Sequence, residues 1–277
     1  MSKFGSQGFP SFALLASTGL ICACSSTAPG PSPDRLQVAA ARAALAPLGT
    51  LRAAINFGNP ILATRHAVSG EPQGVSVDLA RELGSRLGVQ VELILYPAAG
   101  KVVQGIKAGA WDIGFFAIDP VRAEEIDFTP AYVVIEGAYL VPQDSAITRN
   151  EDVDQDGVRV VVGRGSAYDL YLTRELKKAI IVRAATSPAV TDMMLTDQIE
   201  VAAGVKQQLQ DDARRLSGLR LLDGRFMIIN QAMAVPKGRD ATAAAYLSGF
   251  VQEMKSSGFV ARALQRHGID GAAVASL

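Results

Sequence analysis

From Leu51 onward the chain alternates short apolar runs with amphipathic segments, and this alternation constrains the fold more than any other feature. In the first half, strands are predicted at 51–56, 89–95 and 112–118, and helices at 75–87 and 101–108. Apolar residues of the first helix recur every four positions, and Gly88 can end it. Because strand–helix–strand units of this kind build mostly parallel sheets, the sequence predicts an α/β fold.

The same pattern begins again in the second half of the chain. Strands are predicted at 158–162, 179–183 and 199–203, and helices at 166–178, 187–196 and 205–215. Two longer strands, 132–142 and 226–235, are expected to cross between two lobes, with the closing helices 240–257 and 259–266 packed on the first lobe. Lobe 1 would comprise 49–142 and 231–277, and lobe 2 would comprise 143–230. Ligands of open α/β sheets bind at the carboxyl ends of the strands, so a cleft is predicted between the lobes.

The N-terminal residues predict export. Lys3 precedes an apolar run, residues 12–23, that is too short to cross a bilayer and has the size of a signal-peptide core. The run ends in Ile21-Cys22-Ala23-Cys24, which resembles a bacterial lipobox and implies a lipoprotein signal peptide at 1–24 with lipidation of Cys24. An ordinary secretory signal is the alternative. Residues 25–48 predict a linker with a possible short helix.

Composition narrows the partners of the chain. Lys plus Arg number 27 and Asp plus Glu number 27, so no net charge attracts a polyanion, and no nucleic-acid partner is expected. Both cysteines lie in the predicted leader, so we expect no disulfide framework, no metal site and no cofactor. We expect a monomer in the periplasm that contacts the membrane only through its lipid anchor.

Four short segments in order carry a family resemblance: Pro60 after the first strand, Gly74–Ala80, Asp119–Tyr132 and Gly165–Ala167. From Leu51 to about His267 the chain resembles the periplasmic amino-acid-type solute-binding proteins of ABC transporters, bacterial extracellular solute-binding protein family 3. This resemblance implies a two-lobed clamshell that closes on a small solute and delivers it to a permease.

Arg122 matches the arginine with which this family grips the solute's carboxylate. Asp119 and Pro120 have the types of a cap and a first-turn residue, which would place Arg122 in the first turn of a short helix. There the helix dipole opposes a cation by about 0.3 to 1 kcal/mol, so a compensating group is expected. A carboxylate bound to both edges of the guanidinium would supply it. Asp119 or Glu125 as a local ion partner is the alternative.

The Gly165, Ser166 and Ala167 turn matches the segment with which the family's second lobe binds the same carboxylate. A glycine turn that opens a helix after a strand offers N–H groups to an anion. Ser166 could instead cap its own helix, and both roles can hold together.

Several positions depart from the family pattern. The aspartate that pairs with an α-ammonium falls on Val205, and the hydroxyl that assists it falls on Ala117, beside Phe115. Asn59 stands in place of the stacking aromatic, although Phe57 could substitute for it. An apolar residue cannot balance a buried ammonium. The solute is therefore expected to carry a carboxylate without needing a free α-amino group: an amino acid, an amino-acid derivative or an organic acid.

Two other functions were weighed against binding. A cyclohexadienyl-dehydratase-like enzyme on the same fold would need a general acid or base in the cleft. Helix capping or surface exposure explains the candidate carboxylates, which are Asp119, Glu136, Asp169 and Glu200. The two histidines fall in a loop (His66) and near the tail (His267), so no enzyme is expected. A receptor's sensing domain would need a transmembrane helix after residue 270. The residues found there, 271–277, do not predict one, so we expect a free-standing protein, alone or acting with a receptor.

Overall fold

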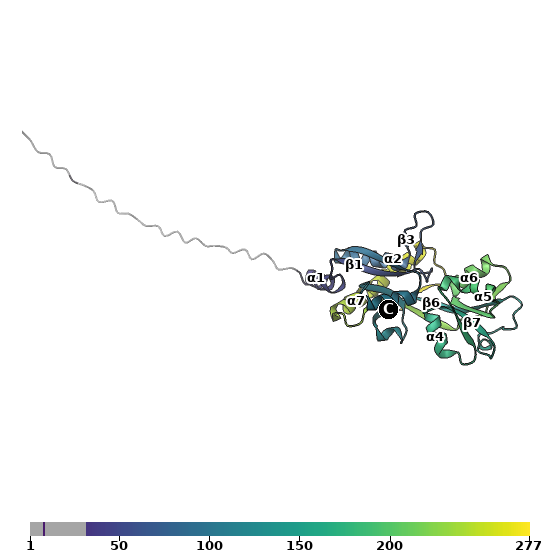
Figure 1. Cartoon of the computed structure of the whole chain (residues 1–277). Helices are drawn as coiled ribbons and strands as arrows, with labels where there is room; N and C mark the ends of the chain where they lie inside the picture. The colour runs from purple at the N-terminus through teal and green to yellow at the C-terminus, as the bar shows by residue number, and fades with distance from the viewer. Residues whose placement is uncertain (1–7, 9–31) are drawn as a thin grey trace, which may run out of the picture. The chain divides into compact units, whose positions relative to one another are not determined.

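The computed structural model describes residue 8 and residues 32–277 (Figure 1). The predicted signal peptide apart from Gly8, the lipidation site Cys24 and the linker as far as residue 31 lie outside the described residues. No helix in the described part of the chain has both the length and the apolar character needed to cross a bilayer.

Helices and strands alternate through residues 33–277. The α-helices are α1 (Pro33–Leu45), α2 (Val75–Leu87), α3 (Ala99–Lys107), α4 (Ala167–Glu175), α5 (Val190–Thr196), α6 (Lys206–Arg215), α7 (Ala241–Ser256) and α8 (Phe259–Arg266). The strands are β1 (Thr50–Asn56), β2 (Thr64–Arg65), β3 (Pro72–Gln73), β4 (Gln90–Tyr96), β5 (Ile113–Ala117), β6 (Ile126–Pro142), β7 (Arg159–Gly163), β8 (Ile180–Ala184), β9 (Val201–Val205), β10 (Leu219–Leu221), β11 (Met227–Pro236) and β12 (Ala273–Val274). Three short 3₁₀ helices are η1 (Arg122–Glu124), η2 (Asn150–Asp152) and η3 (Ser187–Ala189).

Ten strands form one sheet, whose main path runs β4-β1-β5-β11-β6-β9-β7-β8. Strand β1 pairs in parallel with β4 and β5, and β7 pairs in parallel with β8 and β9. The long strands β6 and β11 pair antiparallel with each other and join the two parallel sets. Figure 1 shows β6 between the two parts of the fold. The predicted α/β clamshell with two crossing strands is thereby confirmed, while the exact lobe boundaries stay a prediction.

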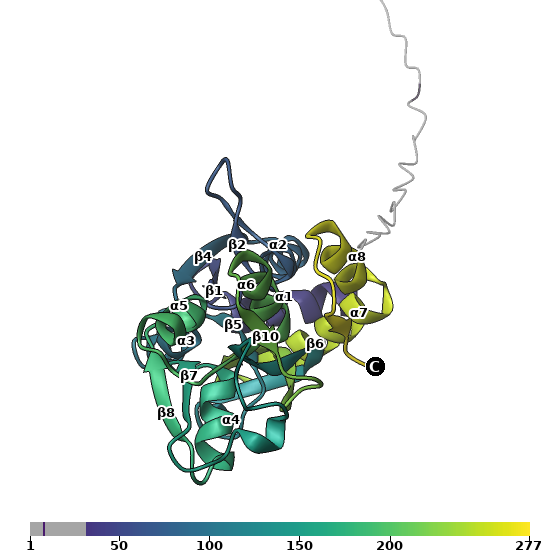
Figure 2. The ribbon, with the colours of Figure 1, turned by 90° about the vertical axis from the view of Figure 1, so that its right-hand side faces the viewer.

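Helix α2 shows how the sequence produces this fold. Its four regularly spaced apolar residues are all buried, so one face of the helix packs into the core: Val75, Leu79, Leu83 and Leu87. Gly88 then takes a left-handed conformation with φ 64°, which a residue without a Cβ adopts at little cost, and the helix ends there as predicted. Beside α2, the β2–β3 hairpin extends away from lobe 1 (Figure 2).

Helix α4 is shorter than predicted and ends at Glu175 instead of 178. The carboxylate of Asp154 accepts hydrogen bonds of 2.8–3.0 Å from three consecutive backbone N–H groups, those of Lys177, Lys178 and Ala179. Because these donors are bound to a side chain from a distant loop, they are withdrawn from the helix. This competing hydrogen bonding is a tertiary effect that periodicity does not reveal.

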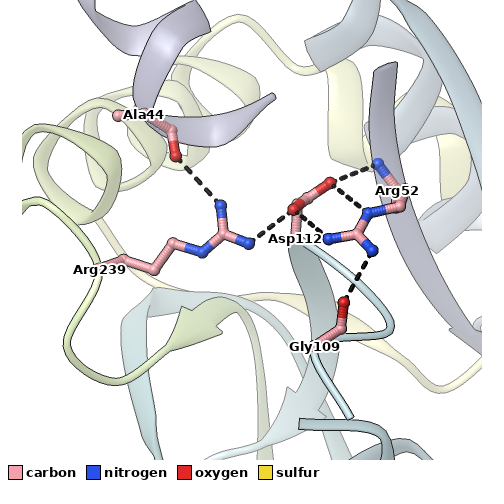
Figure 3. Close-up of polar contacts among 5 residues, drawn as sticks. All are labelled: Ala44, Arg52, Gly109, Asp112 and Arg239. Carbon is pink, nitrogen blue, oxygen red and sulfur yellow. Dashed lines mark hydrogen bonds and ion pairs between the residues drawn. The ribbon is translucent and has the colours of Figure 1, made fainter. Parts of the chain in front are cut away.

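A buried ion cluster anchors α1 to lobe 1 (Figure 3). Asp112 is fully buried, and its carboxylate accepts from Nη2 of Arg52 at 2.8 Å and from Nη2 of Arg239 at 2.6 Å. Burial alone would raise the pKa of Asp112, but the hydrogen bonds from the two guanidinium groups hold it below its ordinary value. Arg239 also donates to the carbonyl oxygen of Ala44 in α1 at 3.2 Å. The helical part of the predicted linker is therefore fastened to lobe 1.

Candidate functional site

A cavity of about 40 Å³ lies where the two lobes meet. Most predicted ligand-binding residues line it, together with others that the sequence did not single out: Asn56, Gly58, Asn59, Leu62, Ser76, Ala99, Phe115, Phe116, Ala117 and Arg122 from predicted lobe 1, Ser166, Ala167, Tyr168, Ser187 and Val205 from predicted lobe 2, and Ile229 and Gln231 from the crossing strand β11. The cavity thus draws on segments from both halves of the chain.

Arg122 stands at the start of η1, directly after the β5 strand and its turn. Its side chain is buried, with Nη1 donating to the carbonyl oxygen of Ala117 at 3.0 Å and Nη2 donating to that of Gly165 at 2.9 Å. Among the described residues, its Nε has no hydrogen-bond partner. A guanidinium has five N–H donors, so a ligand can still be bound by those that remain.

The expected local ion partners of Arg122 are engaged elsewhere. Asp119 pairs with Arg174 of lobe 2 at 2.8 Å and accepts from the backbone N–H of Val121 at 2.9 Å. Glu125 lies 3.5 Å from Lys107. Arg122 therefore has no carboxylate within ion-pair distance among residues 32–277, although Asp119 is near enough to oppose the effect of burial on its pKa.

Burial affects the charge of Arg122. It lowers the pKa of the guanidinium to about 10, against the opposing influence of Asp119, so the group is still charged at neutral pH. The ring of Phe116 lies 5.9 Å from Cζ of Arg122 and offers weak cation–π stabilisation. A buried cation with so little compensation is a favourable position for an anionic ligand.

The turn before α4 supplies the lobe 2 side of the site. The hydroxyl of Ser166 accepts from the backbone N–H of Asp169 at 3.0 Å, so Ser166 caps its own helix. The N–H of Gly165 donates to the carboxylate of Asp169 at 2.8 Å, and the N–H of Ser166 donates to Gly163 at 3.0 Å. The first-turn N–H groups of Ala167 and Tyr168 remain for an anion, since a helix leaves such donors unsatisfied.

Oδ1 of Asn59 has no hydrogen-bond partner in the described part of the chain, and the hydroxyl of Tyr168 makes no well-aligned hydrogen bond there, although Ser166 and Ser187 lie near enough to lower its pKa. Asn59 is 9% exposed and Tyr168 is 2% exposed. Burial raises the pKa of Tyr168 to about 12, so its hydroxyl is neutral at physiological pH. Buried polar groups normally find a partner, and these two are suited to a polar ligand.

Phe57 and Gly165 do not line the cavity. The guanidinium of Arg65 lies 4.7 Å from the ring centre of Phe57, at a separate surface pocket that also includes Thr186 and Pro188. Gly165 instead contributes its carbonyl oxygen to Arg122. Both residues thus lie at the edge of the lobe interface rather than in the cavity.

Sequence reasoning missed Tyr168, Ser76, Ser187 and Gln231. Tyr168 lies two residues after Ser166 in the first turn of α4, a position that could have been found from the predicted turn. Gln231 lies opposite Ala117 in the β11–β5 ladder, a register that only the folded sheet reveals.

The remaining acidic and histidine side chains that were considered for catalysis lie outside the cavity and are engaged. Glu136 pairs with Lys206 and Arg225, Glu200 pairs with Arg159, and Asp169 pairs with Arg183. His267 lies 2.9 Å from Asp78, and His66 lies 3.2 Å from Ser69. Within the described ranges, no three Cys, His, Asp or Glu side chains gather closely enough to hold a metal ion.

Solved structures with this fold include amino-acid-binding proteins. An ancestral amino acid-binding protein, AncCDT-1, described as a precursor of cyclohexadienyl dehydratase, is 21% identical with a TM-score of 0.67, covering 79% of this chain and 95% of that one. An amino acid ABC transporter substrate-binding protein from Streptococcus pneumoniae, bound to L-arginine, is 17% identical with a TM-score of 0.70, covering 82% and 97%. At such identities the likeness concerns the fold.

Among proteins compared by sequence, the membrane-bound lytic murein transglycosylase F of Idiomarina loihiensis is 26% identical over 275 residues. The match covers 92% of this chain but 55% of that enzyme, so the chain spans about half the length of this relative. The family model of bacterial extracellular solute-binding proteins, family 3, matches residues 52–269, which include every residue of the cavity. The chain therefore belongs to the bacterial extracellular solute-binding proteins of family 3.

Proposed function

We propose that this protein captures a small carboxylate-bearing solute between its lobes, outside the inner membrane, and delivers it to an ABC importer. One observation carries the proposal: the buried guanidinium of Arg122 lies at the lobe interface with its Nε donor unpartnered and no carboxylate in ion-pair distance among the described residues. The ABC-transporter context of the Streptococcus pneumoniae structure supports the importer role.

Binding would be coupled to lobe closure. The contacts of Arg122 with Gly165 and of Asp119 with Arg174 connect the two predicted lobes, and we expect them to break when the lobes open. A solute carboxylate held by Arg122 and by the first-turn N–H groups of α4 would add a third link. Because only the closed form makes all three, the solute shifts the population toward it.

Catalysis is the second candidate, because AncCDT-1 is described as a precursor of a dehydratase. Arg122 and Tyr168 are the titratable side chains that line the cavity, and neither exchanges a proton readily near neutral pH. General acid–base catalysis needs a group with a pKa near the working pH. We therefore favour binding, and the activity of the longer transglycosylase is not assigned to this chain.

The lipid anchor is part of the proposal and has a separate test. Replacing Cys24→Ser should abolish fatty-acid labelling and release the mature protein from membrane fractions of an expressing bacterium. Cys22→Ser, two residues earlier, is the matched control and should leave labelling intact. Equal labelling of the two variants would contradict attachment at Cys24.

Thermal unfolding of the purified protein against a library of small acids, amines and sugars tests the binding function, because a ligand raises the melting temperature by mass action. Carboxylates should be the compounds that stabilise. In calorimetry with such a compound, Arg122→Ala should weaken binding by about 100-fold or more, since a buried charge pair is lost. Arg174→Ala, which breaks a lobe contact outside the cavity, should weaken it only a few-fold. An unchanged affinity in the Arg122 variant would remove the physical basis of the function.

A further inference from the structure

We propose that the solute is a small monocarboxylate that carries a neutral hydroxyl beside its carboxylate and no ammonium group. This inference rests on the proposed function and narrows its substrate class. The cavity that would hold the solute places one buried cation among side chains that are all uncharged.

The cavity contains one charge. Of the residues that line it, Arg122 is the only ionised one at neutral pH, and no aspartate or glutamate is among them. Val205 lines the cavity from β9, is 5% exposed and presents an apolar side chain to it. An ammonium in this space would lose its hydration and gain no protein countercharge.

Carboxylates near the site cannot substitute for the missing one. Asp119 is 4% exposed and committed to Arg174 across the lobe interface. Asp169 is also 4% exposed, and it pairs with Arg183 while accepting from the N–H of Gly165. Turning either carboxylate toward a solute would break its ion pair with a half-buried arginine, Arg174 or Arg183, and turning Asp169 would also leave the N–H of Gly165 without its acceptor.

The unpartnered groups indicate what the solute does carry. Nε of Arg122 is a donor and requires an acceptor, which a carboxylate oxygen provides. Oδ1 of Asn59 is an acceptor and requires a donor, and Tyr168 can act in either way. A hydroxyl satisfies Asn59 without introducing a second positive charge. An unsubstituted acid would leave Asn59 unsatisfied.

Size and shape limit the rest of the solute. A cavity of about 40 Å³ is small and favours a small solute. Phe115, Val205 and Ile229 give part of its wall an apolar character. A short aliphatic acid with one hydroxyl therefore fits better than a long or doubly charged molecule.

Isothermal titration calorimetry at pH 7 with two matched sets of acids tests this inference. The three-carbon set is propionate, L-lactate and L-alanine, and the four-carbon set is butyrate, 2-hydroxybutyrate and 2-aminobutyrate. Within each set the hydroxy acid should bind most tightly. The amino acid should bind at least about tenfold more weakly than the hydroxy acid of the same set.

A charge placed in the cavity should reverse the preference. Val205→Asp should raise the affinity for the amino acid relative to the hydroxy acid by about tenfold or more, because it supplies the missing countercharge. Val205→Asn introduces a side chain of the same shape as aspartate but without the charge, and it should not raise the relative affinity for the amino acid. If Val205→Asp fails to fold by circular dichroism, Asn59→Asp supplies the carboxylate from the other lobe.

The outcomes separate the two proposals. If an amino acid binds the natural protein as tightly as its hydroxy counterpart and Arg122→Ala loses that binding, this inference is wrong and the proposed function stands. Binding of none of the six acids would overturn this inference, whereas the proposed function would be overturned only if no carboxylate of the wider library bound.

Discussion

The guanidinium of Arg122 in lobe 1 donates to the carbonyl oxygen of Gly165 in lobe 2 at 2.9 Å. The residue expected to hold the solute thus also holds the two lobes together. A carboxylate that binds Arg122 acts on the same group that closes the clamshell, so ligand binding and closure share one side chain.

Closure should be sensitive to a single methyl group at Gly165. A Cβ there would lie 2.9 Å from the backbone Cα of Gly100 in the opposite lobe, and φ is +70°. Gly165→Ala should therefore weaken solute binding by about tenfold or more, because the closed form must move apart. Calorimetry measures the affinity. Small-angle scattering should show a larger radius of gyration for the solute-bound variant than for the solute-bound natural protein.

Gly218→Ala is the matched control for that experiment. Gly218 has φ +79°, but a Cβ there meets nothing within 4 Å. The Gly218→Ala substitution should lower the free energy of unfolding by about 1 kcal/mol through backbone strain and leave the affinity for the solute unchanged. Equal loss of binding in both variants would show that strain, and not the contact with Gly100, is responsible.

The ion pair between Asp119 and Arg174 should contribute modestly to closure. Its atoms lie 2.8 Å apart, but the Arg174 side chain is 36% exposed, so solvent screening weakens the pair. Asp119→Asn and Arg174→Ala should each increase the dissociation rate of the solute about two- to fivefold. A double-mutant cycle in stopped-flow kinetics should give a coupling of less than about 1 kcal/mol. Independent effects of the two substitutions would contradict a direct contribution.

Folding stability, by contrast, should depend strongly on Asp112. Asp112→Asn leaves Arg52 and Arg239 without their shared carboxylate, and we expect a loss of about 2–3 kcal/mol in the free energy of unfolding. Denaturant unfolding measures it. Asp211→Asn removes an exposed pair with Arg214 and should change stability by less than about 0.5 kcal/mol. Similar losses in both variants would argue against a special role of the buried cluster.

Acid should weaken the protein partly through Glu200. The side-chain hydrogen bond from Arg159 lowers the pKa of Glu200 from its ordinary 4.5 to about 2. Since the folded-state pKa is depressed, the stabilisation is complete above pH 4.5 and is lost as the pH falls from 4.5 toward 2. Both side chains are 38% exposed, so we expect the pair to contribute about 1 kcal/mol at most to the free energy of unfolding. Denaturant unfolding of Glu200→Gln should show this loss at pH 7 and a smaller one at pH 3; an equal loss at both would contradict the assignment.

The sequence determined the order of helices and strands, because hydrophobic periodicity and glycine caps are local properties. The four buried residues of α2 and the left-handed Gly88 illustrate this. Family-specific short segments were also enough to place Arg122 and the Gly165–Ala167 turn at one interface, since their spacing matches a known pattern over residues 52–269.

Only the tertiary structure decided how these residues interact. Arg122 contacts Gly165, which is 43 positions away in the sequence. The N–H of Gly165 donates to Asp169 and is therefore not available to a solute. Phe57 lies under the guanidinium of Arg65, outside the cavity. Such contacts depend on strand register and on the approach of two lobes, which side-chain spacing within one helix or strand does not encode. Local patterns therefore fixed the framework, while long-range packing fixed which polar groups are left for a solute.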